Sequence, residues 1–422
     1  MFESTSVGLI PATCRKVVSG VSTDFGDKTL NIWVANDCWT DGGTKSRLID
    51  QDMVDALAAR FLTSGLGNDI YDWVTNIYGE EWETTLYSNL IAANDEITIL
   101  LYDIDGDDEP NGGVVGFFYG KDNFVAGPDP GIEYSNQRIM FYIDAVMYAN
   151  GDGTWETTDY WPSEIYSTLA HEFQHMIHFY QKTIQRAGSG TETWLNEMLS
   201  MATEDIVADK LGVDGPRGVA YDDPTAGVYP LYEGRLPWYN YYNDISVTYW
   251  PPLTDPTVIL SYSINYAFGA YLMRNYGGAT FLRNVLLNAY TGSDAIDAAL
   301  AAGGYGVDFA RVLQRWGAAN LLSDSTVAPA GYQYNAGDWF ASSFGGVDYK
   351  LGSINLYNYV LDPGGIDQEG PYIYTGAPIG AFGSHPPAAN IYYRLGSDLT
   401  GQVDADVYMG SDVRMTVVVK DD

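Results

Sequence analysis

The spacing of three histidines constrains this chain more than any other feature of its sequence. Four histidines occur in 422 residues, and three of them, His171, His175 and His178, stand within eight positions in "STLAHEFQHMIHFYQK". Apolar residues recur here every three or four positions, which predicts a helix starting at Pro162 and Ser163. On this helix His171 and His175 lie one turn apart on one face, so both imidazoles can bind one metal ion.

The segment "HEFQH" has the form H-E-x-x-H, in which the glutamate is placed to accept a proton. Glu172 projects about 100° around the helix from His171, where its carboxylate can accept a proton from water held at zinc. His178 lies about 10.5 Å along the axis from His171, too far for both rings to bind one ion with bonds of about 2 Å. We expect His178 to be a buried or cleft-lining residue. The alternative for the whole segment is a polar helix with incidental histidines.

A catalytic zinc ion needs a third protein ligand and one open position. A second predicted helix, at 193–211, carries Glu197, and 21 residues separate Glu197 from His175. This separation leaves room for a loop and an antiparallel return that aims the carboxylate at the metal. Acidic residues on helices are common, so the spacing alone leaves the third ligand open.

"HEFQH" followed by "NEMLS" resembles the thermolysin-like zinc peptidases, or gluzincins, whose third ligand is the glutamate of an N-E-x-x-[SA] helix. The resemblance implies zinc as the cofactor. It also implies His171, His175 and Glu197 as the ligands, and Glu172 as the general base.

Two further residues come from a resemblance to the aminopeptidase branch of the same clan. Thermolysin-type enzymes carry an aspartate four positions after the ligand glutamate, where this chain has Met201. Glu204, seven positions after Glu197, resembles the acid that orients a ligating histidine in the aminopeptidases; an exposed surface acid is the alternative. "SYSINYAFGAYL" resembles their Y-x-x-G segment, which implies Tyr266, and second Tyr262, as the donor to the oxyanion. Packing in the core is the alternative for this tyrosine.

Over residues 25–322 the chain resembles the hyicolysin-type family of bacterial secreted zinc metallopeptidases. Successive blocks carry this resemblance: "ILLYDIDGDDEPNGGVVGFF", "IMFYID", "STLAHEFQHMIHF", "TWLNEMLSMATED" and "YAFGAYLMRNYGGATFL". The family implies cleavage of proteins or peptides outside the cell or at its surface. The G-x-M-E-N strand with which aminopeptidases of the clan hold the substrate's amino terminus does not occur here, which favours an endopeptidase. A retired peptidase scaffold that binds proteins or glycans at a surface, and a zinc hydrolase that is not a peptidase, are the alternatives.

The predicted elements indicate an α+β fold in three parts. Residues 1–150 are rich in strands, predicted at 29–36, 96–103, 114–120 and 138–144, with a helix at 52–62. Residues 151–324 form the helical domain that carries the zinc motif, with further helices at 265–276, 280–290 and 308–322. Residues 325–422 form a small β domain with strands in "INLYNYVL" and "RMTVVVK". The segment 212–257 has no period and many Pro, Gly and Tyr residues, so we expect a long loop that walls a cleft.

The charge balance excludes several classes of partner. Acidic residues outnumber basic ones by 55 to 21, which gives a net charge of −34 and repels nucleic acid and anionic membrane surfaces. No apolar run is long enough to span a membrane. The first residues show no secretory signal, so the protein is either cytoplasmic or has lost a leader. Cys14 and Cys38 form either a disulfide or two buried thiols.

A second metal site is suggested by "DIDGDDEPNGG". It spaces Asp103, Asp105 and Asp107 as the start of a calcium-binding loop, but the glutamate that such loops carry at their twelfth position is replaced by Val114. The alternative is an acidic hairpin loop without an ion.

Overall fold

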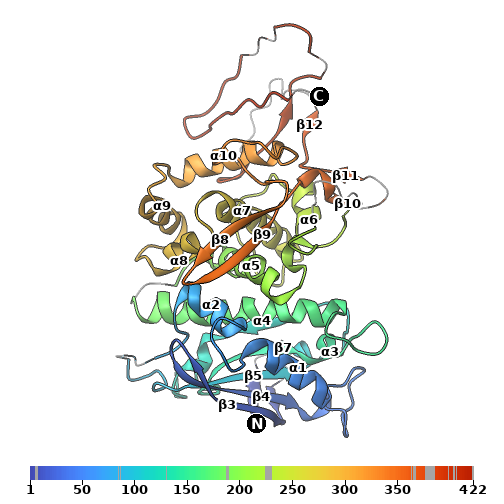
Figure 1. The fold of residues 1–422 in the computed structure, drawn as a ribbon, viewed down its shortest axis with the longest axis vertical. Helices are drawn as coiled ribbons and strands as arrows, with labels where there is room; N and C mark the ends of the chain where they lie inside the picture. Colours follow the sequence, from blue (N-terminus) through green and yellow to red (C-terminus); the bar gives the residue numbers. More distant parts are fainter. Residues whose placement is uncertain are drawn as a thin grey trace.

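The protein is built in layers, with a sheet below, a long helix across it and a helical layer above (Figure 1). The computed structural model describes residues 1–4, 8–83, 85, 87–129, 131–186, 190–223, 231–362, 364, 367–375, 385–397, 399–402, 404 and 406–420. A mixed sheet combined with a separate set of packed helices confirms the predicted α+β fold.

The sheet has five strands in the order β3-β4-β5-β7-β6. Their bounds are β3 Ala12–Thr23, β4 Gly26–Ala35, β5 Glu96–Tyr102, β6 Gly116–Phe118 and β7 Ile139–Asp144. The central strands β4, β5 and β7 pair in parallel, and β3 and β6 are antiparallel edges. Strands β5 and β7 are buried almost throughout because both faces of the sheet are covered, which explains their continuous apolar runs.

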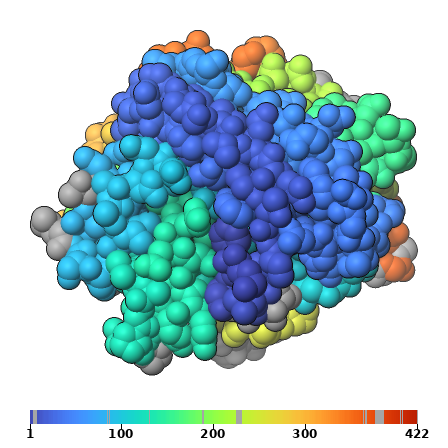
Figure 2. Space-filling model, turned by 90° about the horizontal axis from the view of Figure 1, so that it is seen from below, coloured from blue at the N-terminus to red at the C-terminus, as the bar shows by residue number. Residues whose placement is uncertain are grey.

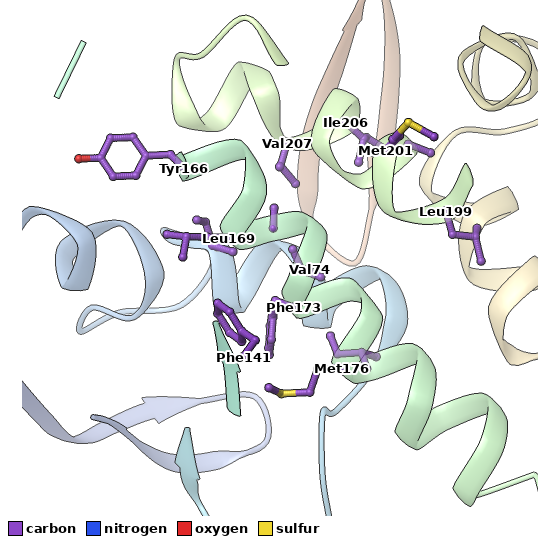
Figure 3. Packing of buried hydrophobic residues seen from close by; sticks show 14 of the residues in the cluster. Val74, Phe141, Tyr166, Leu169, Phe173, Met176, Leu199, Met201, Ile206 and Val207 are labelled. Atoms are coloured by element: carbon purple, nitrogen blue, oxygen red, sulfur yellow. The ribbon is translucent and has the colours of Figure 1, made fainter. Parts of the chain in front are cut away.

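Helix α4, Tyr160–His178, crosses the sheet, and helix α5, Thr193–Leu211, packs on its other side. Leu169 and Phe173 of α4 point towards Phe141 of β7 (Figure 3), and all three side chains are fully buried. Phe61 links the two layers, since its ring lies 5.1 Å from that of Phe173 and 5.6 Å from that of Phe141. The apolar face of α4 therefore fixes the helix on the sheet and turns its histidines towards α5.

The remaining helices surround α4 and α5. Their bounds are α1 Gln51–Phe61, α2 Ile70–Tyr78, α3 Ala145–Tyr148, α6 Leu236–Tyr241, α7 Val258–Asn275, α8 Ala279–Leu287, α9 Gly292–Ala302 and α10 Phe309–Leu321. A π-helical turn, Phe179–Ile184, follows α4. Seen from the sheet side, the surface is formed mainly by the N-terminal part of the chain (Figure 2).

The predicted separate domain from residue 325 needs correction. Strands β8, Trp339–Phe344, and β9, Val347–Gly352, form a hairpin whose second strand packs on α5. Arg274 of α7 donates to the carbonyl of Gly352 over 2.7 Å and pairs with the buried Asp205 of α5 at 2.8 Å. Since Tyr349 and Leu351 also belong to the core of the helical layer, this segment is part of that layer.

The other C-terminal strands are short. They are β10 Val360–Leu361, β11 Gln368–Glu369, β12 Tyr374–Thr375 and β13 Tyr393–Arg394, and near the N-terminus β1 Phe2–Ser4 pairs with β2 Gly8–Ile10. "RMTVVVK", at 414–420, is extended and exposed without a strand partner, so the strand predicted there is wrong. In the described part of the chain, no helix is both long enough and apolar enough to cross a membrane.

The two cysteines are free thiols, so the disulfide alternative is wrong. Cys14 lies on β3 and is half-buried, and Cys38 is fully buried. Burial is the main cause that raises the pKa of both thiols. Both therefore remain protonated and unreactive at neutral pH.

Candidate metal centre

Three side chains from α4 and α5 converge on one point. His171 Nε2 lies 3.2 Å, and His175 Nε2 3.5 Å, from the same oxygen, Oε2 of Glu197. One ligand atom from each residue falls within 4.8 Å of the other two, and no other such group of three or more His, Cys, Asp or Glu residues occurs among the described residues. The structure thus brings together the three residues that the sequence singles out as metal ligands.

Glu204 contacts the edge of the His171 ring that carries Nδ1. Its Oε1 lies 2.7 Å from His171 Nδ1, and its Oε2 accepts a hydrogen bond from Ser167 Oγ over 2.6 Å. Because Nδ1 carries the proton of the bond to Glu204, the lone pair of Nε2 faces the centre of the cluster. Burial raises the pKa of Glu204, but the bond to His171 and the charge of that ring outweigh it, so the net shift is downward.

His175 has a different support, which the sequence analysis missed. Its Nδ1 lies 3.1 Å from Ser200 Oγ, and this hydroxyl also bonds to Gln174 Oε1. Ser200 is the last residue of "NEMLS", so the N-E-x-x-[SA] pattern contained the signal for it. Both histidines are therefore fixed in orientation by α4 and α5 themselves.

Glu172 adjoins the cluster, since the charges of His171, His175 and Glu197 act on it, and one of its carboxylate oxygens has no partner. It is 5% exposed, and its Oε2 has no hydrogen-bond partner among the described residues. Burial is the largest cause that raises its pKa, and Glu197 adds to this, whereas His171, His175 and the backbone amide of Phe118 lower it. A buried carboxylate oxygen without a partner is costly unless it has a proton or a water to bind.

The charges of the cluster favour a cation. Burial lowers the pKa of His171, but hydrogen bonds to Glu197 and Glu204 outweigh it and raise this pKa well above its ordinary value. In His175, too, burial lowers the pKa but the charge and hydrogen bond of Glu197 produce a net rise. Three carboxylates around two imidazoles thus hold positive charge strongly. Two imidazole nitrogens and one carboxylate oxygen are a donor set typical of catalytic zinc, so the residues fit this ion.

The two candidate tyrosines of α7 have different surroundings. Tyr266 is 0% exposed, and after burial the charges that act most on its pKa are those of Asp205 and Arg274. The pKa of Tyr262, one turn earlier on α7, is raised first by burial and then by Glu197 and Glu172. The charges of the cluster therefore act on Tyr262, the second of the two candidates.

Arg235 borders the cluster and was not identified from the sequence. Its guanidinium lies 5.5 Å from the ring centre of Tyr262. Its charge also acts on the pKa values of Tyr262 and Glu204. It stands just before α6, inside the segment 212–257 that we expected to wall a cleft, although 224–230 of this segment lie outside the described residues.

His178 is outside the cluster, as its distance along the helix predicts. Its Nε2 lies 2.9 Å from Thr191 Oγ1. Burial, His175 and Lys182 lower the pKa of His178 to about 3. The ring is therefore neutral at ordinary pH.

The acidic loop at 103–108 does not form a metal cluster in the described structure. Asp103 is paired with Lys45 and accepts the backbone N–H of Asp108 at 3.2 Å. Asp107 accepts the N–H of Glu109 at 3.1 Å. Asp103, Asp105 and Asp107 do not bring their carboxylate oxygens together as a group that could hold a metal ion, so the predicted calcium site has no support from the described residues.

A histidine pair on a helix across a sheet, completed by a glutamate of the next helix, is the arrangement expected of a gluzincin-type metal centre. Residues 12–345 match the Peptidase M30 family, so the chain belongs to this family. The neutral metalloprotease ShpI of Staphylococcus hyicus is 25% identical over 283 residues, which cover 65% of this chain and 52% of ShpI. These two findings confirm the resemblance to hyicolysin-type metallopeptidases.

The chain spans about half the length of ShpI. Among solved structures, two crystal structures of an M1 zinc metallopeptidase from Deinococcus radiodurans are similar, one of them of a mutant. They match 70% of this chain and 49% of their own, with 10% sequence identity and a TM-score of 0.35.

Proposed function

We propose that the protein is a zinc-dependent endopeptidase. One observation supports this above all: Glu172 has a buried carboxylate oxygen without a partner, and the charges of His171, His175 and Glu197 all act on this carboxyl group. A structural zinc site is closed by four protein ligands, whereas three ligands leave a position for water and substrate. The M30 family membership and the likeness to ShpI agree with this function.

His171 Nε2, His175 Nε2 and Glu197 would hold the ion. Bound there, zinc would polarise the carbonyl of the scissile bond and lower the pKa of water to about 7. Glu172 Oε2 takes a proton from the attacking water and passes it to the nitrogen of the leaving amine. The raised pKa of Glu172, caused first by burial, suits a group that must both accept and release this proton.

Tyr262 would donate its O–H to the substrate oxygen that becomes negative. Burial and the nearby Glu197 and Glu172 raise the pKa of Tyr262 well above its ordinary value. The hydroxyl therefore keeps its proton at neutral pH. A fixed donor at this position stabilises the charge that develops in the transition state.

An extended peptide is the substrate that suits the sheet beside the centre. Strand β6 forms the edge of the sheet, packs against α4 and places the backbone amide of Phe118 at Glu172. Sheet edges bind extended peptides through backbone hydrogen bonds. A peptide lying along β6 would present its carbonyl groups to the metal centre.

The test is metal analysis with cleavage of casein, with and without a chelator, for the wild type and Glu172→Gln. We expect one bound zinc in both proteins, cleavage by the wild type alone, and loss of cleavage on chelation. Glu96→Gln, at an exposed position on β5, is the matched control and should cleave normally. Equal cleavage by wild type and Glu172→Gln would refute the mechanism. Zinc without casein cleavage in the wild type would favour the binding scaffold or a zinc hydrolase of another class.

We further propose that the protein acts outside the cell or at its surface. The support is the hyicolysin-type resemblance and a composition rich in Tyr, Trp, Gly, Asn and Asp with little Lys. Fractionation of the producing cells tests it, because activity confined to the cytoplasm would contradict the proposal.

A further inference from the structure

Six aromatic rings outside the metal centre form a continuous row across three segments of the chain. In order they are Trp238, Tyr242, Tyr241, Tyr372, Tyr374 and Tyr393, with successive ring centres 6.2, 4.7, 6.4, 5.0 and 5.6 Å apart. We call this row the aromatic ladder. It joins α6 to β12 and β13, which lie towards the upper right of the molecule in Figure 1.

The aromatic ladder reaches the solvent. Trp238, Tyr372 and Tyr374 are 38%, 36% and 38% exposed, and the other three rings are half-buried. Rings placed only to fill a core would be covered, as Tyr239 of the same helix is. A row of exposed aromatic side chains indicates a binding surface.

The backbone beneath the ladder is held rigid. Tyr372 N–H donates to Asn240 O over 2.8 Å, Tyr374 N–H donates to Tyr392 O over 2.9 Å, and Asn243 donates to Tyr372 O over 3.2 Å. Tyr374 O–H donates to Asp244 over 2.7 Å. The rings are thus preorganised for binding, and these backbone groups are not free to pair with an added peptide strand.

Ile245, the residue after Asp244 in the chain, lines a hollow of about 440 Å³. The hollow is lined mainly by apolar atoms of Ile245, Ser246, Thr248, Tyr249, Pro386 and Pro387. The row itself offers partly exposed aromatic rings, hydroxyl groups and one carboxylate.

We propose that the aromatic ladder binds a neutral oligosaccharide chain. A sugar ring has an apolar C–H face that stacks on an aromatic ring and a rim of hydroxyl groups that bond to tyrosine hydroxyls and a carboxylate. A polyanion is disfavoured, since the only ionised side chain bonded to a ladder ring in the described structure is the acidic Asp244 and the net charge is −34. Strand addition is disfavoured because the backbone groups are already bonded.

The position of the ladder gives this binding a use. Arg235 borders the metal centre, and Trp238 follows it by one helical turn at the start of the ladder. A glycan held on the ladder would keep its attached polypeptide near the cleft. This use rests on the proposed function, whereas the binding itself does not.

The test measures binding of cellohexaose and chitohexaose by calorimetry, with a proline decapeptide as the competing peptide class. We expect saturable binding of at least one hexasaccharide. Trp238→Ala and Tyr372→Ala should each weaken it at least about tenfold, because a single stacked ring carries a large share of the affinity of a small interface. Tyr290→Ala, at a tyrosine 57% exposed outside the ladder, should bind as the wild type does.

Tyr374→Phe keeps the aromatic ring and removes the hydrogen bond to Asp244. This variant tests the aromatic ladder even if an alanine variant fails to fold. We expect Tyr374→Phe to weaken hexasaccharide binding several-fold. Unchanged cleavage of a short unglycosylated peptide by these variants would separate this proposal from the proposed function. The proposal would be overturned if only the proline peptide bound, if neither hexasaccharide bound, or if all the variants bound a hexasaccharide equally well.

Discussion

The support that Glu204 gives to His171 allows a quantitative prediction about metal affinity. Glu204→Gln keeps the size and the hydrogen-bonding shape of the side chain but removes its charge. The bond of 2.7 Å to His171 Nδ1 changes from a charge-assisted bond, worth about 1.5–3 kcal/mol, to a neutral one worth about 0.5–1.5 kcal/mol. The difference of about 1–1.5 kcal/mol corresponds to a roughly tenfold weaker affinity for zinc, at the lower end of the usual range for residues that orient a ligand.

The assay is competition for zinc against a chelator of known affinity, at constant pH and ionic strength. Ser167→Ala is the matched control, since it removes the other bond of Glu204, 2.6 Å long, without removing charge. We expect Ser167→Ala to weaken zinc binding less than Glu204→Gln does. Casein cleavage by Glu204→Gln should recover in large part at saturating zinc, because the ligands and Glu172 remain.

Wild-type zinc affinity in Glu204→Gln would refute this reasoning, provided that circular dichroism shows an intact fold. It would mean that the packing of α4 and α5 alone fixes His171. A variant that binds zinc normally but stays inactive would also refute it, since Glu204 would then act on the reaction and not on the ligand.

Three further predictions concern the tyrosine, the core and the pH dependence of stability. Tyr262→Phe should lower kcat for peptide cleavage by about 10²–10³ and leave zinc affinity unchanged. Tyr266→Phe removes a buried hydroxyl without a partner and should change kcat little. A large loss of kcat in Tyr266→Phe and a small one in Tyr262→Phe would assign the oxyanion role to Tyr266. Asp205→Ala should cost about 3–5 kcal/mol in urea unfolding because it leaves the buried Arg274 charge unpaired, and a loss below about 1 kcal/mol would contradict this. Burial raises the pKa of Asp69 to about 7 in the folded protein, compared with about 3.9 in an unfolded chain. Because the native state binds the proton more tightly, the free energy of unfolding falls as pH rises from about 4 to 7. Asp69→Asn should therefore gain on the wild type by about 1 kcal/mol per pH unit in that window, and an equal stability difference at pH 5 and pH 7 would refute it.

The elements that the sequence predicted are those with a clear period or a clear boundary. Helix α5 was predicted at its observed bounds, 193–211, and the strands β4, β5, β6 and β7 were predicted close to theirs. Helix α2 was missed although its boundaries carry clear signals, since Asp69 caps its first turn and Gly79 ends it with a positive φ. The hairpin β8–β9 was missed although Gly345 and Gly346, both with positive φ, are a typical hairpin turn.

The grouping of His171, His175 and Glu197 could be predicted because it depends on spacing within one helix and on one helix-to-helix return. The choice between the two tyrosines could not be made from the sequence, because Y-x-x-G fits Tyr266 alone, whereas the charges of Glu197 and Glu172 act on Tyr262. Arg235 reaches the cluster through contacts between elements far apart in the chain, which no local pattern records.

The hairpin β8–β9 also affects how the metal centre must be held. Helix α5 carries Glu197 and Glu204 on the side that faces α4. The next residue, Asp205, pairs with Arg274, and Arg274 donates a hydrogen bond to the carbonyl of Gly352 at the end of β9. Neighbouring residues of a helix point about 100° apart, so the same turn of α5 is fixed by the histidine on one side and by the hairpin on the other. A chain cut after residue 324 should therefore lose zinc affinity as well as stability, whereas a chain cut after residue 362 keeps the hairpin and should bind zinc normally. Equal zinc affinity of the two chains, measured at a temperature where both are folded, would show that the hairpin does not support the centre.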